Sequence, residues 1–233
     1  MSPGGWVIVA VVLALALYGA GAVGWKLGRR SALQGRGSGA KPAPREVRTR
    51  TRADQLVDLG ELSELLDRSD VLVVSTLTAG SGVREEVVET AVLDTTGVVR
   101  LDSSRRPAGS GASEGPAGPF RTVYGELVEL LAAAKLVVGY SAARHMRMLA
   151  QTAERHGLKK LPAPDWGCLM RRYTETTAGT GAEWIELTGA RTREGIAAPD
   201  VPAALEDART TLQILRILAR REAAEAEQSR KGR

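Results

Sequence analysis

The sequence opens with twenty consecutive residues, Trp6 to Trp25, that contain no acidic or basic side chain and are mostly apolar. At about 1.5 Å per residue, a helix of this length spans the roughly 30 Å hydrocarbon core of a bilayer. The Trp at each end suits a membrane interface, and Lys26, Arg29 and Arg30 follow at once. Because basic residues flanking a membrane helix stay on the cytoplasmic side, we expect a single transmembrane helix over residues 6–25. In this orientation we expect the N-terminus of the chain to lie outside the cell and the domain that follows the membrane helix to lie in the cytoplasm.

Small residues in this stretch leave two questions open. The string Ala20-Gly21-Ala22 is compatible with a cleavable signal peptide, but no positive segment precedes Trp6, as such peptides require. We therefore favour the anchor. Small residues also recur every four positions at Ala16, Ala20, Gly24 and Gly28, a spacing that lets two membrane helices approach closely. A homodimer through the membrane helix is therefore one possibility, although Ala and Gly are common in any such helix.

Charge is distributed unevenly along the chain. Residues 26–52 hold nine basic side chains against one acid and are rich in Gly, Pro and Ser, which is typical of a flexible linker. We expect these basic residues to contact anionic lipid head groups. The formal charge of the whole chain is +5, of which residues 26–52 supply +8 and residues 220–233 supply +2, so residues 53–219 sum to about −5. This composition does not support a general nucleic-acid footprint on the core.

Residues 53–233 alternate between strand and helix patterns. Leucines at helical spacing predict a helix over residues 54–68, and apolar runs joined by short turns predict three antiparallel strands, the third following the turn 94–97. A Gly/Pro/Ser loop is expected over residues 103–119. The later elements are a helix (122–134), a strand (136–138) and four helices (142–156, 168–176, 183–194 and 203–226). This order predicts an α/β domain with a mixed sheet flanked by helices. We place a preceding helix at 53–69, the domain at 70–221 and a charged tail at 222–233.

Four strings carry a resemblance to a known family. They are VVSTLTAG (Val73 to Gly80), VVETAVLDTTG (Val87 to Gly97), LVVGYSAARHMRMLA (Leu136 to Ala150) and PAALEDARTTLQIL (Pro202 to Leu215). In sequence and in order they resemble the DEDD 3′-5′ exonucleases of the DnaQ-like type, over roughly residues 70–220. The resemblance implies a ribonuclease H-like fold, in which a three-stranded antiparallel meander continues into parallel strands.

The resemblance also implies where catalytic groups would lie. In the family, four carboxylates hold two divalent metal ions about 4 Å apart, and a His acts as general base. Here Ser75 aligns with the first Asp, Leu77 with the Glu, His145 with the second Asp and Pro202 with the general base. Asp207 is the one position that matches. Since Mg²⁺ prefers anionic oxygen ligands, we expect no bound metal, or Mg²⁺ or Mn²⁺ at Asp207 if activity remains.

Several of these residues also have a structural interpretation that requires no catalytic or ligand-binding role. Asp207 also suits the first turn of a helix, where the helix dipole stabilises negative charge. His145 is expected to be partly exposed rather than a metal ligand. The lone cysteine, Cys168, excludes an internal disulfide and is expected in the core. We also expect Trp166 and Trp184 in the core, and solvated surface at the basic pairs Lys159-Lys160 and Arg171-Arg172.

Two classes of function follow. In the first, the domain is catalytically inactive and acts as a membrane-anchored binding or scaffolding module for a protein partner. In the second, it is a metal-dependent 3′-5′ exonuclease on single-stranded DNA or RNA with a rearranged site, in which Glu206 or Glu89 assists Asp207. Nucleic-acid binding without cleavage is a third reading, which the acidic core disfavours.

Overall fold

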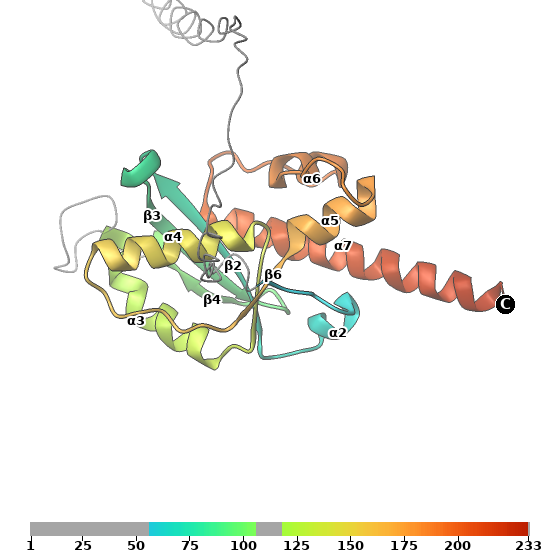
Figure 1. The fold of residues 1–233 in the computed structure, drawn as a ribbon, viewed down its shortest axis with the longest axis horizontal. Helices are drawn as coiled ribbons and strands as arrows, with labels where there is room; N and C mark the ends of the chain where they lie inside the picture. Colours follow the sequence, from blue (N-terminus) through green and yellow to red (C-terminus); the bar gives the residue numbers. More distant parts are fainter. Residues whose placement is uncertain (1–55, 106–117, 233) are drawn as a thin grey trace, which may run out of the picture. The chain divides into compact units, whose positions relative to one another are not determined.

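A six-stranded mixed β-sheet forms the centre of the structure, a computed structural model that describes residues 56–105 and 118–232 (Figure 1). The strands lie in the order β1-β6-β5-β2-β3-β4. Their bounds are β1 Leu56–Val57, β2 Val71–Ala79, β3 Glu86–Asp94, β4 Val99–Asp102, β5 Leu136–Gly139 and β6 Asp165–Cys168. The α-helices are α2 Leu62–Leu66, α3 Gly118–Ala133, α4 Ala142–Arg155, α5 Leu169–Ala178, α6 Leu187–Arg193 and α7 Ala204–Lys231, with short 3-10 turns η2 Gly82–Arg84 and η3 Ser103–Arg105.

Strands β2, β3 and β4 form an antiparallel meander, as the sequence predicts. Val73 lies opposite Leu93, and Val92 lies opposite Leu101. The turn between β3 and β4 is organised by one carboxylate, because Asp94 Oδ1 accepts hydrogen bonds from the backbone N–H groups of residues 96, 97 and 98. Gly97 follows with a φ of +97°, a conformation that favours glycine.

The other half of the sheet is parallel. β5 pairs in parallel with β2 and with β6, and β1 adds a short parallel strand beside β6. Parallel neighbours need a crossover connection, and α4 supplies it between β5 and β6. The expected mixed α/β sheet is therefore present.

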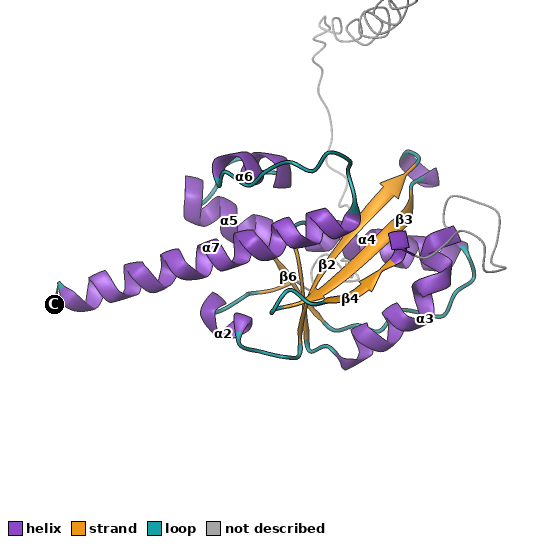
Figure 2. Ribbon diagram, turned by 180° about the vertical axis from the view of Figure 1, so that it is seen from behind, coloured by secondary structure: helices purple, strands orange, loops and turns teal. Residues whose placement is uncertain are grey.

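Helices cover both faces of the sheet (Figure 2). Alternate residues of β2 point to opposite faces, so Val71 and Val73 join the core with α2, α5, α6 and α7, whereas Leu72 and Val74 join the core with α3 and α4. We refer to these sides as the α7 face and the α4 face. Together they make a three-layer arrangement around one sheet.

The predicted helix over residues 54–68 is wrong in its first half. The chain there forms β1, turns at Gly60 with a φ of +61°, and is helical only over Leu62–Leu66. Leu59 packs directly over the sheet, since a Cβ added at Gly167 would lie 2.2 Å from Leu59 Cδ2. The segment is thus part of the domain, not a separate helix before residue 70.

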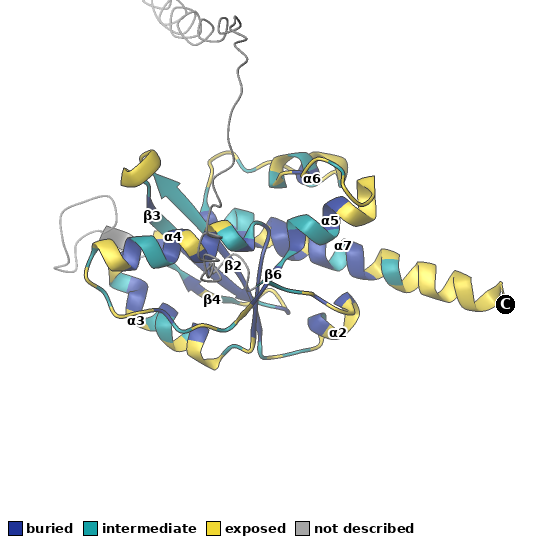
Figure 3. Ribbon diagram, viewed as in Figure 1, coloured by how far each residue is buried: buried dark blue, intermediate teal, exposed yellow. Residues whose placement is uncertain are grey.

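Two further element predictions need correction. Residues 165–168 form β6, so the helix expected from Cys168 begins one residue later, at Leu169. The helix expected to end near residue 226 continues through most of the charged tail (222–233), because α7 extends as far as Lys231, with mostly exposed side chains after residue 221 (Figure 3).

Several sequence predictions fall outside the described residues. These are the transmembrane helix (6–25), the basic linker (26–52), the small-residue spacing and most of the loop 103–119. Within residues 56–105 and 118–232, no helix combines the length and apolar character that crossing a membrane requires.

Candidate functional site

Ser75 and Leu77 lie in the second half of β2, and both side chains point to the α7 face. Ser75 is buried, with 2% of its surface exposed, and Leu77 packs against the apolar core beneath α7. Their partners on β3 are Ala91 and Glu89, respectively. Neither Ser75 nor Leu77 has a carboxylate, so the strand that would hold two metal ligands in the family is neutral here.

Asp207, in the first turn of α7, is ion-paired inside the protein. The guanidinium of Arg191, on α6, donates from Nη2 to Asp207 Oδ1 at 3.0 Å and to Thr210 Oγ1 at 2.9 Å. The Arg191 side chain is 9% exposed and that of Asp207 is 32% exposed. Arg191 Nε is buried with no hydrogen-bond partner among the described residues. A buried cation from the protein therefore neutralises the one carboxylate that matches the family.

Opposing effects act on the acidity of Asp207. Burial raises the pKa of its carboxyl above the ordinary value, and the charge of Glu206 acts in the same direction. The hydrogen bond and charge of Arg191 lower the pKa but do not cancel the effect of burial. Arg191 is thus the group that makes an ionised Asp207 tolerable in this position.

Glu206 and Glu89, the two acids that could assist Asp207 in a rearranged site, also have partners within the protein. Glu206 Oε1 lies 2.5 Å from Arg209 Nη1 on the next turn of α7. Glu89 Oε2 accepts a hydrogen bond of 3.1 Å from the backbone N–H of Ala204. The residue preceding α7, Ala203, has no side chain that could cap the helix. Glu89 therefore serves as a cap for α7 from the neighbouring strand.

His145 lies on the opposite face of the sheet. Its Nδ1 is 2.9 Å from Thr76 Oγ1, and its ring lies against Gly139, where an added Cβ would be 3.0 Å from Cδ2. The expectation of a partly exposed residue is wrong, because His145 is only 9% exposed. Burial, with a smaller contribution from Arg144, lowers the pKa of His145 to about 4, so the ring is neutral near pH 7.

The five family positions therefore do not converge on one point. Ser75, Leu77 and Asp207 belong to the α7 side, His145 belongs to the α4 side, and Pro202 is exposed before α7 begins. Within the described part of the chain, no group of three or more His, Cys, Asp or Glu residues is placed to hold a metal ion.

Other residues singled out by sequence have structural roles. Trp166 is buried as expected, whereas Trp184 is 56% exposed and the prediction of a core position is wrong. Cys168 is half-buried, and its Sγ lies 3.4 Å from the carbonyl oxygen of Tyr140. These contacts give no indication of a nucleophile or a ligand.

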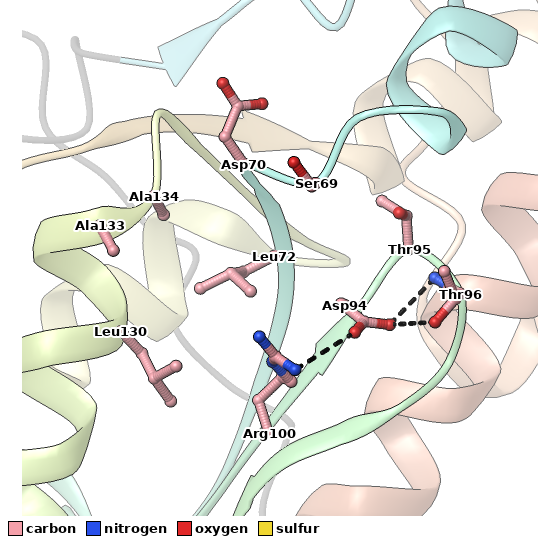
Figure 4. Close-up of a pocket in the computed structure, with 10 residues that line it drawn as sticks. All are labelled: Ser69, Asp70, Leu72, Asp94, Thr95, Thr96, Arg100, Leu130, Ala133 and Ala134. Carbon is pink, nitrogen blue, oxygen red and sulfur yellow. Dashed lines mark hydrogen bonds and ion pairs between the residues drawn. The ribbon is translucent and has the colours of Figure 1, made fainter.

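A hollow of about 180 Å³ lies at the other end of β2, where the strand begins (Figure 4). The two acidic residues that line the hollow, Asp70 and Asp94, both have partners within the protein. Asp94 organises the β3–β4 turn and lies 3.9 Å from Arg100, and Asp70 pairs with Arg68 at 2.8 Å. The residues that line it are Ser69, Asp70, Leu72, Asp94, Thr95, Thr96, Arg100, Leu130, Ala133 and Ala134. We interpret this hollow as part of the turn structure.

Arg191 is the residue of the candidate site that sequence reasoning missed. Its signal is its spacing from Leu187 and Ala190, which places it on the buried stripe of α6. A basic residue on a buried stripe requires a partner, and the nearby acid of α7 provides one.

Comparison of the sequence with protein-family models and with curated proteins gives no match.

Proposed function

We propose that this chain is a single-pass membrane protein whose cytoplasmic domain is a ribonuclease H-like relative of the DEDD exonucleases. In this proposal the domain no longer cleaves nucleic acid and acts as a binding or scaffolding module. The observation that carries the proposal is the ion pair at 3.0 Å between the buried guanidinium of Arg191 and the partly buried carboxylate of Asp207.

The fold supports the family assignment. An antiparallel meander, β2-β3-β4, continues through β2 into the parallel strands β5 and β6, as the resemblance implies. The last long helix, α7, packs against β2 and β3, where the aligned Ser75 and Leu77 lie. Fold alone does not establish a function.

The chemistry supports loss of catalysis. Two dications a few Å apart need several carboxylates to offset their mutual repulsion. The aligned positions provide a hydroxyl, an alkyl group, a neutral imidazole on the other face and one acid. That acid already has a cationic partner, Arg191, which a metal ion would have to displace.

The alternative, an active exonuclease with a rearranged site, would need Glu206 or Glu89 beside Asp207. Glu206 is paired with Arg209, and Glu89 caps α7, so recruiting either would break an existing contact. These contacts favour the inactive module.

The test uses the purified full-length chain in lipid nanodiscs, labelled single-stranded DNA and RNA, and Mg²⁺ or Mn²⁺. We expect no shortening of either substrate. Digestion that disappears in Asp207→Asn would overturn the proposal, whereas digestion that is equal in this variant would identify a copurified nuclease.

A further inference from the structure

The hairpin that joins β2 to β3 ends in a tip, residues 80–85, that α4 holds in place. Arg144 on α4 contacts both Thr78 and Glu85, and Gln151 donates to the carbonyl oxygen of Glu85 at 3.1 Å. Arg155 contacts the backbone carbonyl of Val83. The tip is therefore a braced projection (Figure 1) rather than a free loop.

The next residues of β3 are fixed in the same way. Glu86 is 8% exposed and lies 3.0 Å from His156 Nε2 and 3.5 Å from Arg155 Nη1. Thr152 Oγ1 accepts a hydrogen bond of 2.9 Å from the backbone N–H of Val87. Both acids near the tip, Glu85 and Glu86, thus have basic partners on or beside α4.

The apex of this braced tip is apolar and exposed. Val83 has 86% of its surface exposed and is flanked by Gly82 and by Arg84, which is also exposed (Figure 3). An isolated exposed apolar residue needs no explanation. Here, however, it stands on a projection fixed by several hydrogen bonds and beside a concentration of basic charge.

Basic charge exceeds acidic charge around the tip. Residues 80–87 and 142–161 contain six basic and three acidic side chains, a net +3, although residues 53–219 as a whole sum to about −5. The rest of that region therefore carries about −8. Among the described residues, four exposed basic side chains here form no ion pair within 4.0 Å, namely Arg84, Arg147, Lys159 and Lys160. Arg147 lies near enough to Glu85 to lower the pKa of that carboxyl, after the larger effects of Thr78 and Arg144.

We infer that the hairpin tip together with the basic side chains of α4 and the segment after it forms a docking face for an anionic lipid surface. We define this docking face as residues 80–85 with Arg144, Arg147, Arg155, Lys159 and Lys160. Its basic side chains would contact lipid phosphates, and Val83 would enter the interface between head groups and acyl chains. The inference rests on the predicted membrane anchor and goes beyond the proposed function, since it does not depend on the family assignment.

Because of the predicted linker, even a weak affinity of the docking face for lipid would be sufficient for docking. From composition we predict that residues 26–52 form a flexible linker, and a flexible chain of 27 residues has an end-to-end distance of roughly 30 Å and at most about 95 Å when extended. On this prediction the domain would stay near the bilayer at a high effective concentration. A flexible linker would not fix the orientation of the domain, so the charge on the surface of the domain would determine which face meets the lipid.

The chemistry of the docking face fits lipid better than nucleic acid. Single-stranded nucleic acid is bound by aromatic side chains that stack on bases, in addition to basic charge. The docking face has no aromatic residue, and the exposed Trp184 belongs to the segment between α5 and α6.

The experiment measures the environment of Val83 in the full-length chain. An environment-sensitive fluorophore is attached to Val83→Cys in a Cys168→Ser background, and the matched control carries it at Val98→Cys. Val98 is also exposed, at 54%, and lies at the opposite end of β3. We expect a blue shift at position 83 in vesicles that contain anionic phosphatidylglycerol, none in purely zwitterionic vesicles, and none at position 98.

Charge removal tests the basic part of the docking face. Arg84→Gln with Arg147→Gln should abolish the blue shift, whereas the matched pair Arg193→Gln with Arg220→Gln, both exposed and distant in sequence, should retain it. The shift should also be lost in about 1 M salt, where the Debye length falls to about 3 Å. Circular dichroism of each variant verifies folding.

Three results would overturn the inference: no shift at position 83, equal shifts at positions 83 and 98, or a shift produced by single-stranded DNA or RNA instead of by anionic vesicles. Vesicle flotation reports membrane insertion separately, so failure of the docking face is distinguishable from failure of the predicted anchor.

Discussion

On the α7 face of the sheet one buried guanidinium meets one carboxylate, whereas on the α4 face several basic side chains pair with acids at the solvent boundary. The first contact, between Arg191 and Asp207, lies against an apolar core. The second set joins Glu85 and Glu86 to α4 near the exposed hairpin tip. In the first pair the cation is the buried member, at 9% exposed against 32% for the acid, whereas in the second set the acids are the buried members, at 20% and 10% against 46% and 31% for the arginines. Since removing the partner of a buried charge leaves that charge desolvated, the two faces differ in which charge is left buried: a cation on the α7 face and carboxylates on the α4 face.

The largest effect is expected for Arg191→Ala on the α7 face. This variant leaves the Asp207 carboxylate partly buried without its partner and opens a cavity beneath α6. We expect the free energy of unfolding to fall by about 4 kcal/mol, because the variant loses the packing of the buried Arg191 side chain and its hydrogen bonds to Asp207 and Thr210. Thermal unfolding followed by circular dichroism measures it. Arg193→Ala, an exposed residue of the same helix, is the control and should stay within about 0.5 kcal/mol of wild type. Equal effects of the two variants would show that the pairing of Arg191 with Asp207 contributes no more to stability than an exposed residue of the same helix.

The next effect concerns pH and the α4 face. The folded-state pKa of His145 is about 4, below the ordinary value of 6.5, so between these values the unfolded chain binds a proton that the folded protein does not. The resulting stability is fully present above pH 6.5 and is lost as the pH falls toward 4, with a total of about 3 kcal/mol. Denaturation with urea across this range tests it. His145→Asn can keep a hydrogen bond to Thr76 and should flatten the pH dependence; an unchanged slope would refute the assignment.

The smallest effect concerns the helix cap on the α7 face. Glu89→Ala leaves the N–H of Ala204 without its acceptor and should lower the free energy of unfolding by about 1 kcal/mol. Glu89→Gln retains a carbonyl oxygen and should lose less than half of that. If the two variants lose the same amount, Glu89 contributes through its charge rather than through this hydrogen bond.

The meander and the last helix could be predicted from sequence because their signals are local. Continuous apolar runs and the Asp94–Gly97 turn mark β2, β3 and β4, and a long apolar stripe marks α7. β6 was missed because Trp-Gly-Cys lacks β-branched residues and depends on pairing with β5. The leucine spacing of residues 54–68 suggested a helix, but Leu56 and Leu59 are placed by contacts with β6 that are distant in sequence.

In the candidate site, too, some residues could be placed from local sequence patterns and others depend on contacts that are distant in sequence. The identities of Ser75, Leu77 and Asp207 can be read directly, and their placement on one side of β2 and α7 follows from strand and helix periodicity. The partner of Asp207 could not be identified in this way, because Arg191 belongs to a short helix whose position depends on tertiary packing. For the same reason the burial of His145 against Gly139 and Thr76 was not foreseen.

The strand β1 has a mechanical consequence. It is only two residues long and is held to the sheet by the pairing of Leu56 with Trp166 and of Val57 with Gly167. A pulling force transmitted along the chain from the residues before Leu56 would load this pair of strands before any other part of the sheet. Under tension β1 would detach first and Leu59 would follow from its place over Gly167, while the strands β2 to β6 stayed paired. Tension would therefore extend the chain by a short, fixed length before it threatened the fold.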